Sequence, residues 1–195
     1  MSVIFGIDEP GKIYICGDRR GSTAEGKLIN DNLQKVIEIH PSLAFASAGN
    51  AAIELAIKKE IEKSNNRNEL TTNGLIDIIE NFYNRVRAVN EAFILNLPYY
   101  CLIAGKATDG AGALISLACK QGNLSYKSVP MALYHPADAD QKQCNLIFAR
   151  NYKSNYKDFC ENTVREISEI SYVVSPTGDK WIFDKTTGTG TLYTF

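Results

Sequence analysis

Two short stretches near the start of the chain carry residue types that could support acyl-transfer chemistry. Ser2 follows the first methionine, and the charged run Asp18-Arg19-Arg20 ends an apolar, strand-like segment. A serine at a mature N-terminus combines a hydroxyl nucleophile with its own base, a free α-amine whose pKa is about 7.7 to 8.0. Removal of Met1 would therefore give a nucleophile that needs no histidine. The structural alternative to a reactive charge cluster at Asp18-Arg19-Arg20 is a solvated turn after a strand.

The sequence offers few residues for a histidine-based catalytic site, a metal site or a cysteine site. The chain has two histidines, and His40 and His135 each precede a proline in a polar turn or loop. His135 with Asp138 and Asp140 could bind a metal ion, but a solvated acidic loop explains the same residues. The five cysteines are widely spread and never form C-x-x-C, so they indicate neither a disulfide framework nor a zinc site. We therefore expect no metal and no cofactor.

Composition limits the class of protein. The 195 residues suit one domain spanning residues 1–195, and the formal net charge of -1 gives no sign of binding to nucleic acid or an anionic membrane. No apolar run approaches the roughly 18 residues of a spanning helix. The first ten residues lack the features of a signal peptide, and the unpaired cysteines suit a reducing compartment. The expected location is the cytoplasm.

Short β-rich runs dominate the first fifty residues. Residues 3–7 and 12–16 flank the turn sequence Asp-Glu-Pro-Gly and predict an N-terminal hairpin. Further strands are expected at residues 27–29, 33–39 and 43–48, and the last of them ends at Gly49. These strands must position whatever chemistry Ser2 and the charged run perform.

The hydrophobic period then changes to that of a helix. Ile53, Ile57 and Ile61 recur every four residues, and a second apolar series runs from Leu75 to Phe93 and is ended by residues 96–98. Strands are expected at residues 99–104, 113–120 and 124–129. Residues 144–170 should be helical in one or two pieces, and residues 171–175 and 180–184 should form a last hairpin.

The order of these elements predicts the fold class. Strands and helices come in blocks and do not alternate strictly, which favours antiparallel sheets covered by helices, an α+β architecture.

The first 60 or so residues resemble a proteasome β-type subunit, a member of the N-terminal nucleophile (Ntn) hydrolase superfamily. The resemblance rests on four motifs in order, followed by an amphipathic helix: Ser2 with Gly6, Gly17-Asp18-Arg19-Arg20, the run Asn32-Leu33-Gln34-Lys35-Val36, and the run from Ala44 to Gly49. It implies a four-layer αββα sandwich of two antiparallel sheets flanked by helices. The family's later aspartate and Ser-Gly-Gly element has no clear match, and residues 164–170 occupy that region.

Residue roles follow from the resemblance by position. Ser2 would be the nucleophile, Lys35 the charged neighbour that favours its deprotonation, and Asp18 the partner of Lys35. Arg20 would support the same cluster, and the Gly49 N–H would stabilise the oxyanion. The reaction would be cleavage of an amide bond through an ester on Ser2.

The resemblance also implies a substrate site. A peptide would bind as an added strand between residues 21–23, which include Gly21 and Ser22, and residues 49–51. The main side-chain pocket would be lined by Leu33, Ile37, Ser47 and Ala51, with a small residue at its base, and would suit an uncharged hydrophobic side chain. The partners implied are a peptide or protein substrate and further copies of the chain, in a ring or a smaller homo-oligomer; an ATPase partner is unknown.

Two other functions remain open from the sequence. The chain could be a non-catalytic scaffold or ring subunit of the same fold, in which case Met1 would be retained. It could also be a small-molecule amidase of the same superfamily, which the residues do not distinguish from a peptidase.

Overall fold

The computed structural model describes residues 2–23, 27–95, 98–154 and 157–195, with only the backbone at 93 and 94. It is a mixed α/β structure built on antiparallel sheets, which confirms the predicted class. The strands are β1 (Ile4–Asp8), β2 (Lys12–Asp18), β3 (Gly21–Ser22), β4 (Leu28–Asn30), β5 (Val36–His40), β6 (Leu43–Gly49), β7 (Tyr99–Lys106), β8 (Gly112–Lys120), β9 (Asn123–Ser128), β10 (Met131–Tyr134), β11 (Gly178–Asp184) and β12 (Thr189–Thr194).

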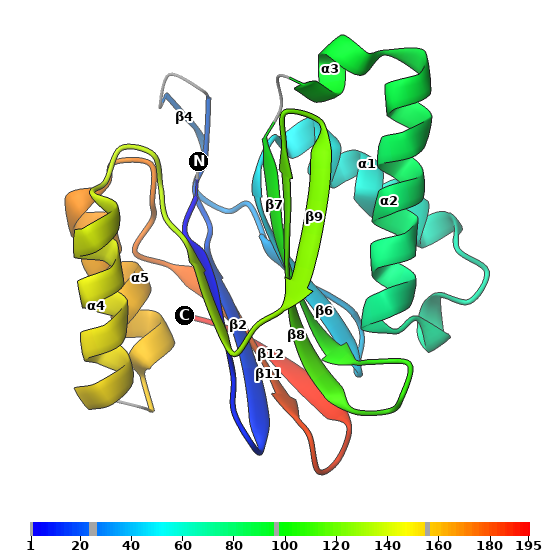
Figure 1. Cartoon of the computed structure of the whole chain (residues 1–195). Helices are drawn as coiled ribbons and strands as arrows, with labels where there is room; N and C mark the ends of the chain where they lie inside the picture. Colours follow the sequence, from blue (N-terminus) through cyan, green and yellow to red (C-terminus); the bar gives the residue numbers. More distant parts are fainter. Residues whose placement is uncertain (1, 24–26, 96–97, 155–156) are drawn as a thin grey trace.

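Helices lie between and after the strand blocks. They are α1 (Ala51–Lys63), α2 (Thr72–Val89), α3 (Glu91–Leu95), α4 (Gln141–Ser154) and α5 (Phe159–Ile170), with a short 3-10 turn at Arg67–Glu69. One five-stranded sheet has the order β10-β1-β2-β11-β12, and the other has the order β5-β6-β7-β8-β9. Strands β3 and β4 form a separate two-stranded ribbon, which projects at the end of the molecule where the N-terminus lies (Figure 1).

The two large sheets share a buried apolar core. Alternate residues of β1 and β2, such as Ile4, Ile13 and Ile15, pack with residues of β6 and β7 such as Ala46 and Leu102. This alternation places one face of each sheet against the other. The residues that alternate with these isoleucines on β1 and β2, such as Phe5 and Tyr14, therefore point to the opposite face of the sheet.

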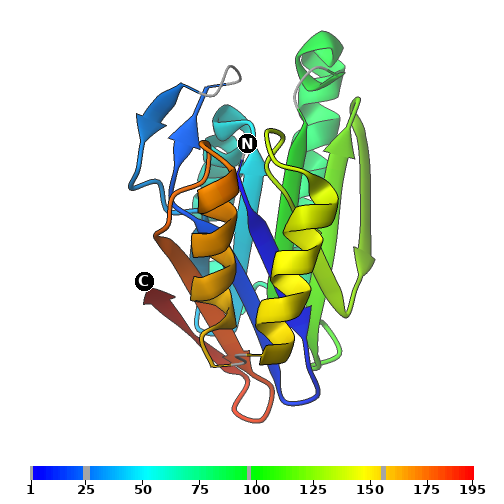
Figure 2. The ribbon, with the colours of Figure 1, turned by 90° about the vertical axis from the view of Figure 1, so that its left-hand side faces the viewer.

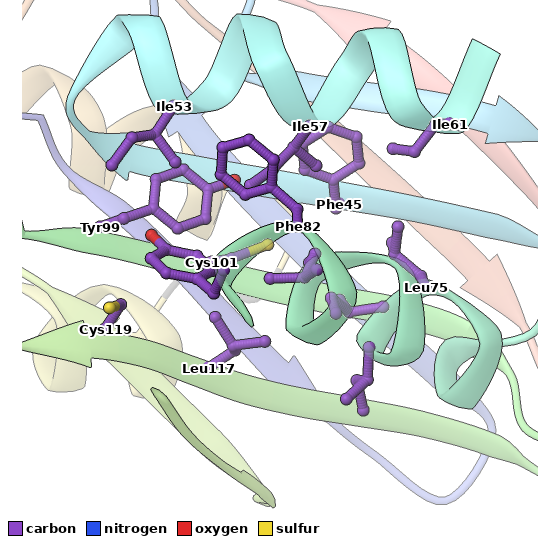
Figure 3. Close-up of a cluster of buried hydrophobic side chains, with 14 of the residues drawn as sticks. Phe45, Ile53, Ile57, Ile61, Leu75, Phe82, Tyr99, Cys101, Leu117 and Cys119 are labelled. Carbon is purple, nitrogen blue, oxygen red and sulfur yellow. The ribbon is translucent and has the colours of Figure 1, made fainter. Parts of the chain in front are cut away.

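Two pairs of helices cover the outer faces. Figure 3 shows Ile53, Ile57 and Ile61 of α1 and Leu75 and Phe82 of α2, which pack on Phe45, Tyr99, Cys101, Leu117 and Cys119 of β6, β7 and β8. Helices α4 and α5 lie side by side over the other sheet (Figure 2). There Phe148, Phe159 and Val164 pack on Phe5 and Tyr14. The predicted four-residue spacing of the α1 isoleucines is thus the spacing of its buried face.

Some element predictions were wrong. Residues 171–175 form no strand, and β11 pairs with β12 instead. Strands β3, β10 and β12 were not predicted from the sequence. Strand β5 begins at Val36, so Leu33 and Lys35 precede it. The helix predicted from Leu75 to Phe93 is divided at Asn90 into α2 and α3, and its predicted end at Asn96-Leu97 lies outside the described residues.

Two further properties concern the described part of the chain. None of its helices has both the length and the apolar character that crossing a membrane requires. All five cysteines are buried as free thiols.

Candidate functional site

The carboxylate of Asp18 organises the candidate site at the end of β2. Its Oδ1 accepts hydrogen bonds from the Val3 backbone N–H at 3.1 Å and from Lys35 Nζ at 2.6 Å. Its Oδ2 accepts from the backbone N–H groups of Arg20 at 2.8 Å and Ser175 at 3.3 Å. Asp18 is completely buried. The solvated-turn alternative is therefore wrong for this residue.

Lys35 is the second buried charge. Its side chain is 2% exposed, although an alternating strand sequence would ordinarily place a lysine on an exposed face. Its stem lies against β2, where a Cβ on Gly17 would be 3.5 Å from Lys35 Cβ. Burial lowers the pKa of Lys35 below its ordinary value, and the Asp18 carboxylate opposes this change. The expected pairing of Asp18 with Lys35 is thus present.

The chain end lies beside this pair. The Val3 N–H and the Lys35 ammonium are both within hydrogen-bond distance of the same Asp18 oxygen, so the ammonium is next to the peptide that joins Ser2 to Val3. Ser2 is 8% exposed. The structure therefore brings together three of the residues predicted to act in catalysis, from the chain start, β2 and the segment before β5.

Arg20 contributes to the site mainly through its backbone. Its N–H donates to Asp18, while its guanidinium pairs with Asp31 and donates to the Tyr172 carbonyl oxygen at 2.8 Å. Arg19 instead forms a two-point ion pair with Asp179 of β11. The two arginines thus hold neighbouring segments around Asp18.

Gly49, the predicted oxyanion donor, has a backbone that other residues rarely adopt. Its φ is +117°, and an added Cβ would lie 2.4 Å from the Pro98 carbonyl oxygen. Helix α1 begins two residues later, where the Asn50 side chain accepts from the Ala52 and Ile53 N–H groups. Gly49 therefore joins the end of β6 to the capped start of α1, and its N–H is held in a fixed backbone geometry.

The residues predicted to line the substrate pocket differ in how far they are buried. Leu33 and Ile37 are half-buried and Ala51 is exposed, but the hydroxyl of buried Ser47 donates to the Glu54 carboxylate at 2.6 Å. A buried acidic group, which the sequence did not predict, therefore lies next to one of the residues predicted to line the pocket. On the ribbon, Gly21 and Ser22 are half-buried, and an added Cβ on Gly21 would be 3.3 Å from Leu33.

The segment between α5 and β11 belongs to the site, which the sequence did not predict. Ser175 donates its N–H to Asp18, and its hydroxyl accepts from the Arg19 N–H at 3.2 Å. Asp138 anchors the start of the same segment through the Ser171 hydroxyl and the Tyr172 N–H. The serine, proline, threonine and glycine residues of S-x-x-x-S-P-T-G were the available signal for a loop, although Val173 and Val174 between them favoured a strand.

The candidate metal site is not formed. Asp138 binds Ser171 and Tyr172, Asp140 accepts from the Gln143 N–H at the start of α4, and His135 Nδ1 lies 2.9 Å from the Pro136 carbonyl oxygen. Across the residues that the structure describes, no group of three histidine, cysteine or acidic side chains could hold a metal ion.

Comparisons with known proteins add no family. No family model matches the chain, and no curated protein matches it either.

Proposed function

We propose that this protein is an N-terminal-serine hydrolase that cleaves amide bonds after removal of Met1. The observation that carries the proposal is the shared Asp18 oxygen, which holds a buried Lys35 ammonium next to the Ser2–Val3 peptide. A buried ion pair is costly to maintain, and such groups with shifted pKa values are frequent at reactive sites. In this proposal the arrangement of helices on two facing sheets is the four-layer αββα fold of the Ntn hydrolases.

The proposed reaction proceeds in two steps. The Ser2 hydroxyl attacks the amide carbonyl carbon and gives its proton to the freed α-amine of the same residue. The Lys35 ammonium favours negative charge on the serine oxygen, and the Gly49 N–H stabilises the oxyanion. The intermediate then expels the substrate amine, which takes the proton. Water attacks the resulting Ser2 ester, releases the carboxylic acid and restores the hydroxyl.

The substrate proposed is a peptide or protein, bound between the β3 ribbon and the start of α1. The carboxylate of Glu54 behind Ser47 makes an acidic side chain the least favourable occupant of the pocket. Assembly into a homo-oligomer, as a ring or smaller, is part of the same proposal. Size-exclusion chromatography with light scattering measures that assembly directly, and a monomer at micromolar concentration contradicts it.

The catalytic proposal is tested with fluorogenic tripeptide amides that end in acidic, basic or apolar residues. The wild-type protein should release the fluorophore, and Ser2→Ala should abolish release while leaving stability unchanged. Ser125→Ala, on the exposed strand β9, removes a hydroxyl elsewhere and should retain full activity. Intact mass shows whether Met1 is lost. Retained Met1 with no hydrolysis would favour the scaffold alternative, and hydrolysis of simple amides only would favour a small-molecule amidase.

A further inference from the structure

Glu54 is a buried acidic residue that the proposed reaction does not use. It lies in the first turn of α1, and its side chain is 10% exposed. Its Oε2 accepts from the Ser47 hydroxyl at 2.6 Å, and its Oε1 accepts from Lys58 Nζ at 2.5 Å. Glutamate is rarely buried to this degree unless it is paired. Glu54 is therefore not an ordinary solvent-exposed residue of the helix surface.

We propose that Glu54 is a positioning residue for Lys35: it fixes the end of β6 against the lysine backbone and supplies a second negative charge to the lysine ammonium. This inference rests on the proposed function, because it assigns Glu54 to the same site.

The structural link runs through Ser47. The Ser47 backbone N–H donates to the Lys35 carbonyl oxygen at 3.2 Å, while the Ser47 hydroxyl donates to Glu54. One residue thus connects the segment before β5, strand β6 and helix α1. Gly49 lies two residues beyond Ser47 on the same strand. By holding Ser47, Glu54 sets the position of Gly49 relative to Lys35.

Among the described residues, the charges that face Lys35 come from three places, and removal of Met1 would add the α-amine of Ser2 to all of the variants alike. Asp18 of β2 binds the ammonium directly, Arg20 follows β2, and Glu54 faces it from α1. Burial is the largest effect and lowers the lysine pKa, and the positive charge of Arg20 acts in the same direction. Asp18 and then Glu54 raise the pKa. Glu54 thus helps to keep Lys35 protonated.

The charged and titratable groups that face Glu54 come from its own helix and from β7. Lys58 is a cation on its own helix, and Tyr99 and Cys101 face it from β7. Burial chiefly raises the pKa of Tyr99 and of Cys101, and the Glu54 charge raises both further, so both are neutral near pH 7. The first turn of a helix also stabilises a carboxylate. The positive charge of Lys58 therefore offsets part of the negative charge that Glu54 presents to Lys35.

The proposal predicts opposite effects from two substitutions. Glu54→Gln keeps an oxygen that accepts from Ser47 but removes the charge, so Lys35 should lose its proton at a lower pH than in the wild-type protein. Lys58→Met removes the competing cation, so Lys35 should lose its proton at a higher pH. Glu62→Gln makes the same charge change at an exposed position of α1 and should leave Lys35 unchanged.

The measurement is an NMR titration of the full-length protein with 13C-labelled lysine, in which the Lys35 signal is assigned by its loss in Lys35→Met. The proposal is overturned if Lys35 titrates at the wild-type pH in Glu54→Gln, or if the two substitutions move it in the same direction. This readout needs no turnover. Absence of hydrolysis by a protein with the predicted titrations would reject the proposed function alone.

A second readout separates the charge from the structural link. If the protein hydrolyses the fluorogenic tripeptide amide that ends in an apolar residue, the alkaline limb of kcat for that peptide should move to lower pH in Glu54→Gln by the shift seen for Lys35, with KM unchanged. Ser47→Ala keeps the charge but removes the link, so it should lower kcat without moving the limb. An unmoved limb in Glu54→Gln contradicts the proposed charge effect.

Discussion

The two members of the buried ion pair should differ in their importance for stability. Lys35→Met leaves the Asp18 carboxylate with three backbone donors, from Val3, Arg20 and Ser175. Asp18→Ala leaves a buried ammonium without its direct partner and also leaves those three N–H groups without their acceptor. Breaking a buried pair costs about 3–5 kcal/mol, and unsatisfied donors add to that cost. We expect about 3 kcal/mol for K35M and about 5 kcal/mol or more for D18A.

Urea unfolding at pH 7 and one fixed protein concentration measures both changes in the free energy of unfolding. The double variant completes the cycle, and its cost should be at least about 2 kcal/mol smaller than the summed costs of the single variants, because the second removal no longer breaks a pair. Equal costs for the two single variants, a larger cost for K35M, or strict additivity would refute the reasoning from Asp18's other donors.

Three further predictions concern stability. Gly49→Ala should destabilise the fold by about 1–3 kcal/mol and abolish hydrolysis, because its φ is +117° and its Cβ would meet Pro98; unfolding curves and peptide hydrolysis check this. Asn50→Ala should cost about 1 kcal/mol in urea unfolding, since it removes the cap of α1. Burial raises the pKa of the Cys101 thiol above its ordinary 9.0. The thiol therefore contributes fully to stability below pH 9.0, and this contribution is lost as the pH rises towards the folded-state pKa. In urea unfolding above pH 9.0, the free energy of unfolding of Cys101→Ala should fall less steeply with pH than that of the wild-type protein.

Elements with strong local patterns were predicted well. The N-terminal hairpin corresponds to β1 and β2, and the four-residue spacing of Ile53, Ile57 and Ile61 located α1. Both patterns are set by burial on one face, which a sequence reports directly.

The last hairpin could not be predicted from local patterns. Strand β12 consists largely of threonine and glycine, and it is fixed by contacts with β11: Leu192 pairs with Trp181, and a Cβ on Gly190 would be 2.1 Å from the Trp181 ring. These contacts depend on the fold of the whole chain end. The apolar residues Val173 and Val174 suggested a strand, but they are buried with α4 and α5 as part of a loop.

The candidate site was predicted in part for the same reason. Asp18 and Lys35 belong to short motifs that a family resemblance reveals, and the structure pairs them. Ser175 reaches Asp18 from 157 residues away, so only the tertiary structure reveals it. Glu54 follows the buried Ile53 in a run that also resembles an exposed helix face, and its hydrogen bond with Ser47 gave no sequence signal.

The most direct test of the account uses a peptide epoxyketone, an electrophile that can bond to a hydroxyl and an amine on the same residue, followed by mass mapping of the adduct. The account predicts loss of Met1 and one adduct that joins both groups to Ser2, absent in Ser2→Ala and retained in Ser125→Ala. A wild-type protein that keeps Met1, or that forms its adduct at any other residue, would contradict the central claim that Ser2 is both nucleophile and base.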